Sequence, residues 1–161
     1  MSWSRRSLLC LPLLAAVAAC GFTPVYGPGA QGRGLLNSIE VQEQTSREGF
    51  LLVRQLEERL GRAADPQYQL TLDITTSEAG LAVDPAGDIE RFHVVGATSY
   101  ALIETVTGET VLSGQVDDFT GYSSSGSTVA TLASRRDAYE RLMVILADEL
   151  IVRLQTARLP S

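Results

Sequence analysis

The sequence predicts an α+β two-layer sandwich, with two helices packed on one face of a mostly antiparallel four-stranded sheet. Apolar side chains recur at helical spacing over residues 50–60 and again over residues 139–154. Between these segments, over residues 67–75, apolar and polar side chains alternate with the period of a strand. Turn residues then separate two further extended segments. The expected element order is therefore strand, helix, three strands and helix.

The first strand and the first helix are predicted within residues 37–61. The segment NSIEVQEQ places Ile39 and Val41 between polar neighbours, as in a short strand. Residues 45–48, Thr-Ser-Arg-Glu, resemble a capping box, which begins a helix. Gly61 is expected to end that helix. The predicted buried stripe of the helix consists of Phe50, Val53, Leu56 and Leu60.

Three extended segments are expected to follow. In the first, Tyr68, Leu70, Leu72 and Ile74 share one face, and a sheet that buries only one face is normally antiparallel. Residues 84–87, Asp-Pro-Ala-Gly, predict a turn before a strand over 92–106. Thr107 and Gly108 predict a hairpin turn into a third strand over 109–120.

A Gly/Ser-rich loop, GYSSSGST, is expected to lead into the last helix over residues 133–157. Its apolar positions form a broad stripe, which suits a helix that lies across a sheet better than a coiled-coil seam. The members of the stripe are Tyr139, Leu142, Met143, Leu146, Leu150 and Leu154, widened by Val144, Ile145, Ile151 and Val152.

The N-terminal residues have the pattern of an export signal. Arg5 and Arg6 precede an apolar run that is too short to span a membrane comfortably. The run ends in Val17-Ala18-Ala19-Cys20, which resembles the lipobox of bacterial lipoproteins. In such signals the cysteine is lipidated and becomes the first mature residue. An ordinary secretory signal with an incidental cysteine is the alternative, and the paired arginines leave twin-arginine export open.

Three regions are expected from this pattern: a cleaved lipoprotein signal peptide over 1–19, a lipidated Gly/Pro-rich tether over 20–36, and an α+β domain over 37–158. Because each buried CH₂ contributes about 0.8 kcal/mol, several acyl chains on Cys20 would hold the domain firmly at a membrane. Cys10 would leave with the signal, so the mature chain would form no internal disulfide.

The charge composition argues against a nucleic-acid partner. The chain carries 13 basic and 19 acidic residues, a net charge of −6. Without Arg5 and Arg6, 11 basic residues would face 19 acidic ones, a net charge of −8. A nucleic-acid-binding protein normally has a basic footprint instead. Every basic residue is arginine, the better bidentate partner for phosphate, although a high genomic GC content also explains this bias.

The sequence predicts no catalytic site, no metal site and no cofactor. The single histidine, His93, has no cysteine or histidine near it at ligand spacing and is expected to be structural. Adjacent acidic residues diverge on strands and helices, so they are expected to be solvated surface: Asp117-Asp118, Glu57-Glu58 and Asp148-Glu149. Asp84 and Asp88 have the spacing of a calcium turn without the further acidic ligands of a calcium loop.

Three arginines are the candidates for contact with an anionic ligand. Arg91 is predicted beside the turn before a strand, where it either meets an anion or pairs with a neighbouring carboxylate such as Glu90. Arg135 and Arg136 are predicted to open the last helix, where a cation opposes the helix dipole. This placement permits contact with a partner or a phosphate.

Several segments together resemble the LPS-assembly lipoprotein (LptE) family in its alphaproteobacterial form. They cover nearly the whole mature chain in the same order of elements: CGFTPVYG, REGFLLVRQLEERL, YQLTLDI, ATSYALIETVTGETVLSGQV and TVATLASRRDAYERLMVILADELIVRL. The resemblance implies an outer-membrane lipoprotein on the periplasmic side, lodged as a plug in the β-barrel LptD. It also implies a role in barrel assembly and lipopolysaccharide transport, without catalytic activity.

Within that family, basic residues near a strand turn are associated with lipopolysaccharide contact, and Arg91 is the nearest match here. A polar sheet face is compatible with a hydrated barrel lumen. Two alternatives come from other classes: an auxiliary lipoprotein of a lipid-transport ABC system, and a small lipid-anchored hydrolase. The absence of a nucleophile–histidine–acid or metal-ligand pattern in the sequence argues against the hydrolase.

Overall fold

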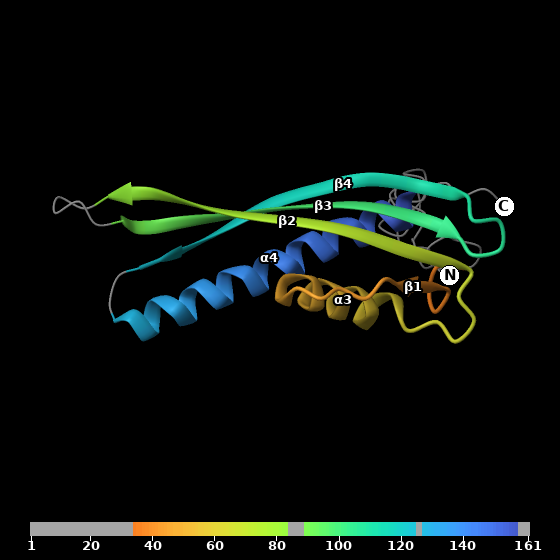
Figure 1. Cartoon of the computed structure of the whole chain (residues 1–161), viewed down its shortest axis with the longest axis horizontal. Helices are drawn as coiled ribbons and strands as arrows, with labels where there is room; N and C mark the ends of the chain where they lie inside the picture. Colours follow the sequence, from red (N-terminus) through yellow and green to blue (C-terminus); the bar gives the residue numbers. More distant parts are fainter. Residues whose placement is uncertain (1–33, 84–88, 125–126, 158–161) are drawn as a thin grey trace, which may run out of the picture.

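The computed structural model describes residues 34–83, 89–124 and 127–157. Their elements are β1 (Ile39–Val41), α3 (Arg47–Leu60), β2 (Tyr68–Val83), β3 (Ile89–Glu104), β4 (Thr110–Ser123) and α4 (Thr128–Thr156). The sheet has the order β1-β2-β3-β4, with β1 parallel to β2 and the other pairs antiparallel. Both helices lie on the same side of the sheet (Figure 1). The predicted α+β fold and element order are confirmed.

Helix α3 begins one residue later than the capping-box pattern predicts. Its N-cap is Ser46, whose hydroxyl accepts a hydrogen bond from the Gly49 amide at 3.0 Å. The third position after the cap is therefore Gly49 and not Glu48, so the predicted box does not form. Gly61 ends the helix as expected, with a φ of 78° that favours glycine.

The predicted buried stripe of α3 is wrong at Phe50, which is 63% exposed. The buried side chains are instead Leu51, Leu52, Leu56 and Leu60. At 100° per residue, Phe50 lies about 160° around the helix from Leu52, so the two side chains cannot both face the core. Spacing of three and four is compatible with either residue, and the sequence pattern did not distinguish them.

The β2–β3 hairpin is longer than predicted, because backbone pairing continues where the apolar alternation stops. Strand β2 runs to Val83 and β3 begins at Ile89, with these two residues paired. The predicted turn at 84–87 lies outside the described residues. The hairpin turn before β4 is confirmed, with Gly108 at a φ of 72°. Strand β4 continues to Ser123 and α4 begins at Thr128, which shortens the predicted Gly/Ser loop from both sides.

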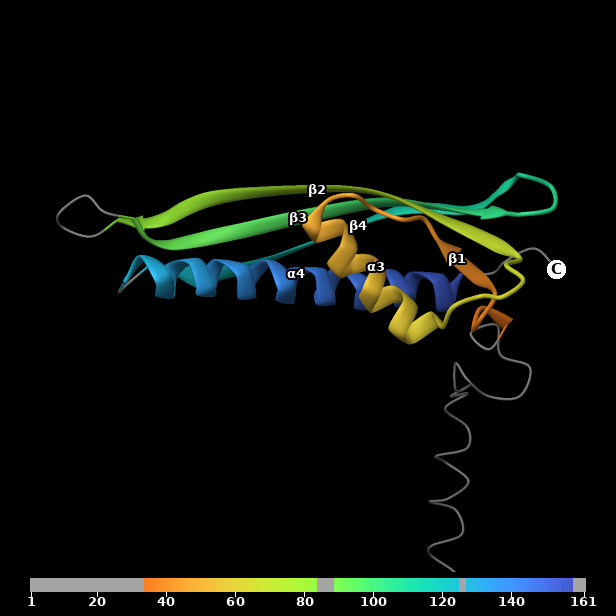
Figure 2. The same cartoon turned by 60° about the horizontal axis from the view of Figure 1, so that its bottom comes forward.

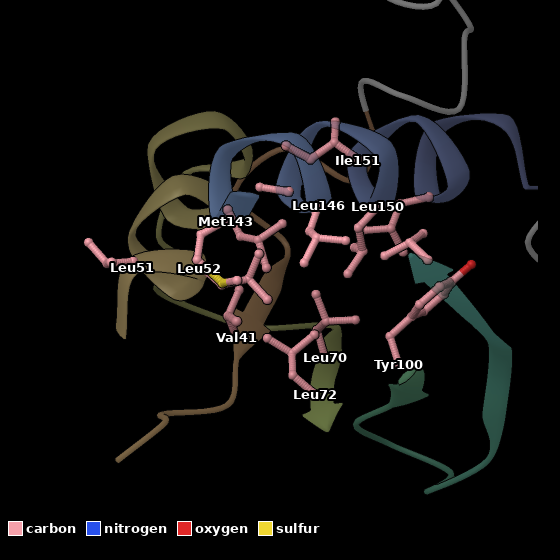
Figure 3. Close-up of a cluster of buried hydrophobic side chains, with 14 of the residues drawn as sticks. Val41, Leu51, Leu52, Leu70, Leu72, Tyr100, Met143, Leu146, Leu150 and Ile151 are labelled. Atoms are coloured by element: carbon pink, nitrogen blue, oxygen red, sulfur yellow. The ribbon is translucent and has the colours of Figure 1, made fainter. Parts of the chain in front are cut away.

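The core lies between the helix-facing side of the sheet and the two helices (Figure 3). Even-numbered residues of the three long strands face the helices, among them Leu70, Tyr100 and Val116. The core also includes Leu35, which is only 2% exposed. The tether predicted over 20–36 is therefore wrong at its C-terminal end, because the apolar Leu35 packs with the domain.

Helix α3 is much shorter than the elements beside it. Its 14 residues span about 21 Å, against about 43 Å for the 29 residues of α4. It therefore lies under one half of the sheet only (Figure 2). The fully buried residues of α4 begin at Ala138. The part of α4 before Ala138, residues 128–137, lies beside the far half of the β2–β3 hairpin. These two segments form an arm that α3 does not cover, which we call the distal arm.

Candidate binding site

A pocket of about 330 Å³ opens where the cover by α3 stops. Its wall is formed by the start of α3, the middle of β2 and the first half of α4. The lining residues are Arg47, Glu48, Thr76, Leu132, Arg135, Arg136 and Tyr139. The sequence-predicted candidates Arg135 and Arg136 thus lie in one pocket, and a third arginine from a different helix joins them. We call this pocket the arginine pocket.

Beside the arginine pocket, the carboxylate of Glu78 holds β2, β4 and α4 together. Arg135 donates from Nε to Glu78 Oε2 at 2.8 Å, and the Tyr139 hydroxyl donates to the same oxygen at 3.3 Å. The Tyr122 hydroxyl donates to the other oxygen, Oε1. The guanidinium of Arg135 also lies over the Tyr139 ring, 5.4 Å from its centre. Arg135 is therefore already engaged as a structural ion pair.

The pKa shifts in this cluster follow from its hydrogen bonds. Burial works against the charged carboxylate, but the hydrogen bonds from Tyr122 and Arg135 and the charge of Arg135 lower the pKa of Glu78. Burial and the bond to Glu78 raise the pKa of Tyr122 to about 12. Burial and the Glu78 charge also raise the pKa of Tyr139. Both phenols therefore stay protonated donors near neutral pH, and neither is available as a base.

Arg47 and Arg136 contribute positive charge to the arginine pocket. In the described part of the chain, neither has an ion-pair partner within 4.0 Å. Both side chains are exposed, and Arg47 is the first residue of α3, where the helix dipole adds to the positive potential. The sequence prediction missed Arg47, because nothing in the local pattern places it near residues 135 and 136.

The predicted position of Arg135 and Arg136 at a helix start is corrected by the structure. Helix α4 begins at Thr128, so both arginines lie more than one turn inside it. The helix dipole acts mainly within the first turn, so the expected unfavourable placement does not arise.

Arg91 lies apart from the other two candidates. It is an exposed residue within β3, not in the preceding turn, and it is paired with Ser123 of β4. As an odd-numbered residue of β3, it is on the face of the sheet that points away from the helices, which we call the open face. There it lines a shallow pocket of about 340 Å³ with His93 and Ser123. The structure therefore separates Arg91 from the arginine pocket.

His93 has a structural contact, as the sequence analysis expected. It lies in an inner strand of the sheet, and its ring is 5.0 Å from that of Phe119 on the neighbouring strand. Together with Val95 and Phe119, which are exposed, it makes this part of the open face apolar. Elsewhere the open face carries Thr71, Asp73, Thr75, Ser77, Ser99 and Gln115.

The remaining candidates do not form a site. Asp118 accepts a hydrogen bond from the Phe119 amide, Glu57 pairs with Arg62, and Asp148 pairs with Arg59. Within residues 34–83, 89–124 and 127–157, no three potential metal ligands lie close enough to hold an ion. No helix in those ranges is long and apolar enough to cross a membrane. Cys20, Asp84 and Asp88 lie outside the described residues.

Several solved structures that match this fold are named as lipoproteins. A Caulobacter crescentus protein assigned as a lipoprotein superimposes with a TM-score of 0.67 at 25% identity, covering 79% of this chain and 94% of its own. Rare lipoprotein B from Shewanella oneidensis has a TM-score of 0.54 at 13% identity, covering 72% and 89%. A minor lipoprotein from Acinetobacter baumannii has a TM-score of 0.56 at 17% identity, covering 76% and 91%. No family model and no curated protein matches this sequence.

Proposed function

We propose that this chain is a bacterial outer-membrane lipoprotein, anchored through lipid on Cys20 and exposed to the periplasm. The proposal rests above all on the match of nearly the whole domain to the Caulobacter lipoprotein. The lipobox-like Val17-Ala18-Ala19-Cys20 supports it independently, because it lies outside the part of the chain that defines the fold.

Within that class, the protein acts as the plug of the β-barrel LptD and assists its assembly in lipopolysaccharide transport. The resemblance of its segments to the LptE family supports this partner. The open face of the sheet is compatible with a water-filled lumen, because it carries polar side chains on all three long strands, among them Asp73, Ser99 and Gln115. We propose a binding protein and not an enzyme, since the arginine pocket presents guanidinium donors beside an apolar wall and the sequence shows no nucleophile–histidine–acid pattern.

Lipopolysaccharide contact would use the arginine pocket. Guanidinium groups bind phosphate in a planar, bidentate manner, and Arg47 and Arg136 form no ion pair within 4.0 Å in the described part of the chain. Leu132 and Tyr139 supply an apolar wall beside these charges. Such a combination suits a phosphorylated lipid headgroup. Arg91, on the open face, is a second and separate candidate contact.

Co-expression with the barrel tests the plug. The wild-type chain should co-purify one-to-one with LptD from detergent-solubilised outer membranes, and depletion of the chain should reduce mature barrel and surface lipopolysaccharide. Cys20→Ala should release the chain from the membrane fraction. Association with an inner-membrane permease instead would favour the ABC-system alternative. Unchanged barrel and lipopolysaccharide levels after depletion would reject the proposal.

Charge reversal tests the lipid contact. We expect the double variant Arg47→Glu/Arg136→Glu to bind purified lipopolysaccharide at least about tenfold more weakly. Arg54→Glu makes the same kind of charge change in α3 outside the pocket, at an arginine that pairs with Glu58, and should change binding little. Arg91→Glu, measured alongside, reports on the open-face candidate. Equal binding by the double variant and wild type would exclude the arginine pocket.

A further inference from the structure

The outer edge of β4 has no neighbouring strand among the described residues. Strand β4 is the last strand in the sheet order, and no described strand pairs with its outer side. Edge strands present backbone amides and carbonyls that another chain can use as a template, so folded proteins usually protect them. The outward backbone groups that already have hydrogen-bond partners are not free to bind another strand. The outward groups without such partners indicate where another strand can bind.

One hydrogen bond fixes which residues of β4 point outward. The Ser124 amide donates to the Glu90 carbonyl at 2.9 Å, so the pair formed by these two residues is hydrogen-bonded. In an antiparallel ladder such pairs alternate, and the regular register from Leu112 to Ser123 continues that alternation. Even-numbered residues of β4 therefore bond to β3, and odd-numbered residues direct their N–H and C=O groups to the free edge.

Side chains cap this edge at its far end. The Phe119 amide donates to Asp118 Oδ1 at 2.7 Å. The Gly121 carbonyl accepts from Arg141 Nη2 at 3.1 Å, so α4 also protects the edge there. Both capped residues are odd-numbered, which agrees with the alternation derived above. An incoming strand would have to displace these two caps.

The segment from Ser113 to Asp117 has no such caps. Its odd-numbered residues Ser113, Gln115 and Asp117 are exposed, and their outward amides and carbonyls have no hydrogen-bond partner in the described part of the chain. This leaves a window of three N–H and three C=O groups, spaced for one short strand. The caps at 119 and 121 mark where the window ends.

The charge around the window argues against a second copy as the occupant. Asp117 lies in the window and Asp118 beside it, and the chain has a net charge of −6. Pairing two such edges would bring acidic strands together, which is unfavourable. A neutral or basic extended segment is complementary instead. Because a closed barrel pairs all its own wall strands, such a segment would come from a loop or a terminus of the barrel chain.

We infer that residues 113–117 of β4 receive an extended, neutral or basic segment of the barrel partner as an additional strand of this sheet. The inference rests on the proposed function and adds to it the mode of contact. Backbone hydrogen bonds to the added strand supply the affinity, and Asp117 favours a basic side chain on that strand.

Residue-resolved hydrogen exchange on the full chain, free and in the barrel complex, tests this inference. In the free protein, the amides of Ser113, Gln115 and Asp117 should exchange quickly and those of Val116 and Asp118 slowly. In the complex, the three odd-numbered amides should become protected. Gln115→Pro should lower recovery of the complex at least about tenfold, since it removes an outward donor and adds bulk at the edge. Gln115→Ala keeps the donor and is the matched control.

The outcomes separate this inference from the proposed function. Protection of the odd-numbered amides supports strand addition, and the exchange measurement on the unmodified chain decides this even if the proline variant fails to fold. A complex that forms without such protection overturns the inference and leaves the plug intact. Failure of the chain and the barrel to form any complex overturns both.

Discussion

A buried hydroxyl on β3 allows a sharp test of the packing. The Thr98 side chain is fully buried, between its register partners Ile74 and Val116. Its Oγ1 has no hydrogen-bond partner among the described residues. Thr120 on the next strand is also buried, but its hydroxyl donates to the Ala138 carbonyl of α4 at 2.9 Å. The same substitution, threonine to valine, should therefore have opposite effects at these two positions.

The magnitudes follow from the two environments. An unsatisfied buried polar group costs about 1–3 kcal/mol, so Thr98→Val should raise the free energy of unfolding by about 1–2 kcal/mol. Thr120→Val removes a hydrogen bond and should lower it by about 1 kcal/mol. The cost stays modest because the Ala138 carbonyl keeps its bond within the helix. The two variants should thus differ by about 2–3 kcal/mol.

Urea unfolding followed by far-ultraviolet circular dichroism measures these differences directly. Thr98→Ser serves as a control, because it keeps the hydroxyl and removes only the methyl group; it should be destabilised by about 1 kcal/mol. A Thr98→Val protein less stable than wild type would mean that the hydroxyl is satisfied in solution.

Three further predictions concern the polar cluster, the cap of α3 and the contact of Gly96 with α4. Glu78→Gln should lower the melting temperature near neutral pH. The pKa of Glu78 is lowered from 4.5 in the folded state, so the stabilisation from its carboxylate is lost as the pH falls below that value. The difference in melting temperature between the variant and wild type should then shrink. Gly61→Ala should cost about 1–2 kcal/mol in urea unfolding, since φ at this position is 78° and the new methyl group would meet the Asn37 side chain. Gly96→Val should cost about 1–3 kcal/mol, because a Cβ there would lie 2.9 Å from Cδ2 of Leu142, and a double-mutant cycle with Leu142→Ala should recover part of that loss.

The sequence was sufficient for the order and type of the elements, because side-chain periodicity reports which face is buried. It was poorer at their ends. Strand β2 continues to Val83 because β3 supplies partners for its backbone, and this depends on a segment elsewhere in the chain. The error at Phe50 has a similar origin, since Leu56 and Leu60 belong to either possible stripe and only packing against α4 decides between them.

The candidate site was predicted only in part. Arg135 and Arg136 were selected from local sequence, but the partner of Arg135 is 57 residues away, and Arg47 comes from another helix. Periodic patterns report on residues within about one helical turn, so they do not reveal such long-range contacts. The position of Arg91 likewise depends on where β3 begins, because pairing with β2 and β4 extends the strand from the predicted residue 92 back to Ile89.

The distal arm has few apolar contacts, and this affects the order in which the domain unfolds. It lacks the leucines of α3. Its contacts include the Glu78 cluster, which joins β2 and β4 to α4, and the stacked rings of Phe92 on β3 and Tyr122 on β4, 5.1 Å apart. Regions with few apolar contacts open at a lower free energy than the rest of a domain. The arm should therefore unfold locally as a cooperative unit while the half of the sheet that α3 covers stays folded. In the proposed complex, this arm is the part of the chain that can change its conformation while the domain enters the barrel.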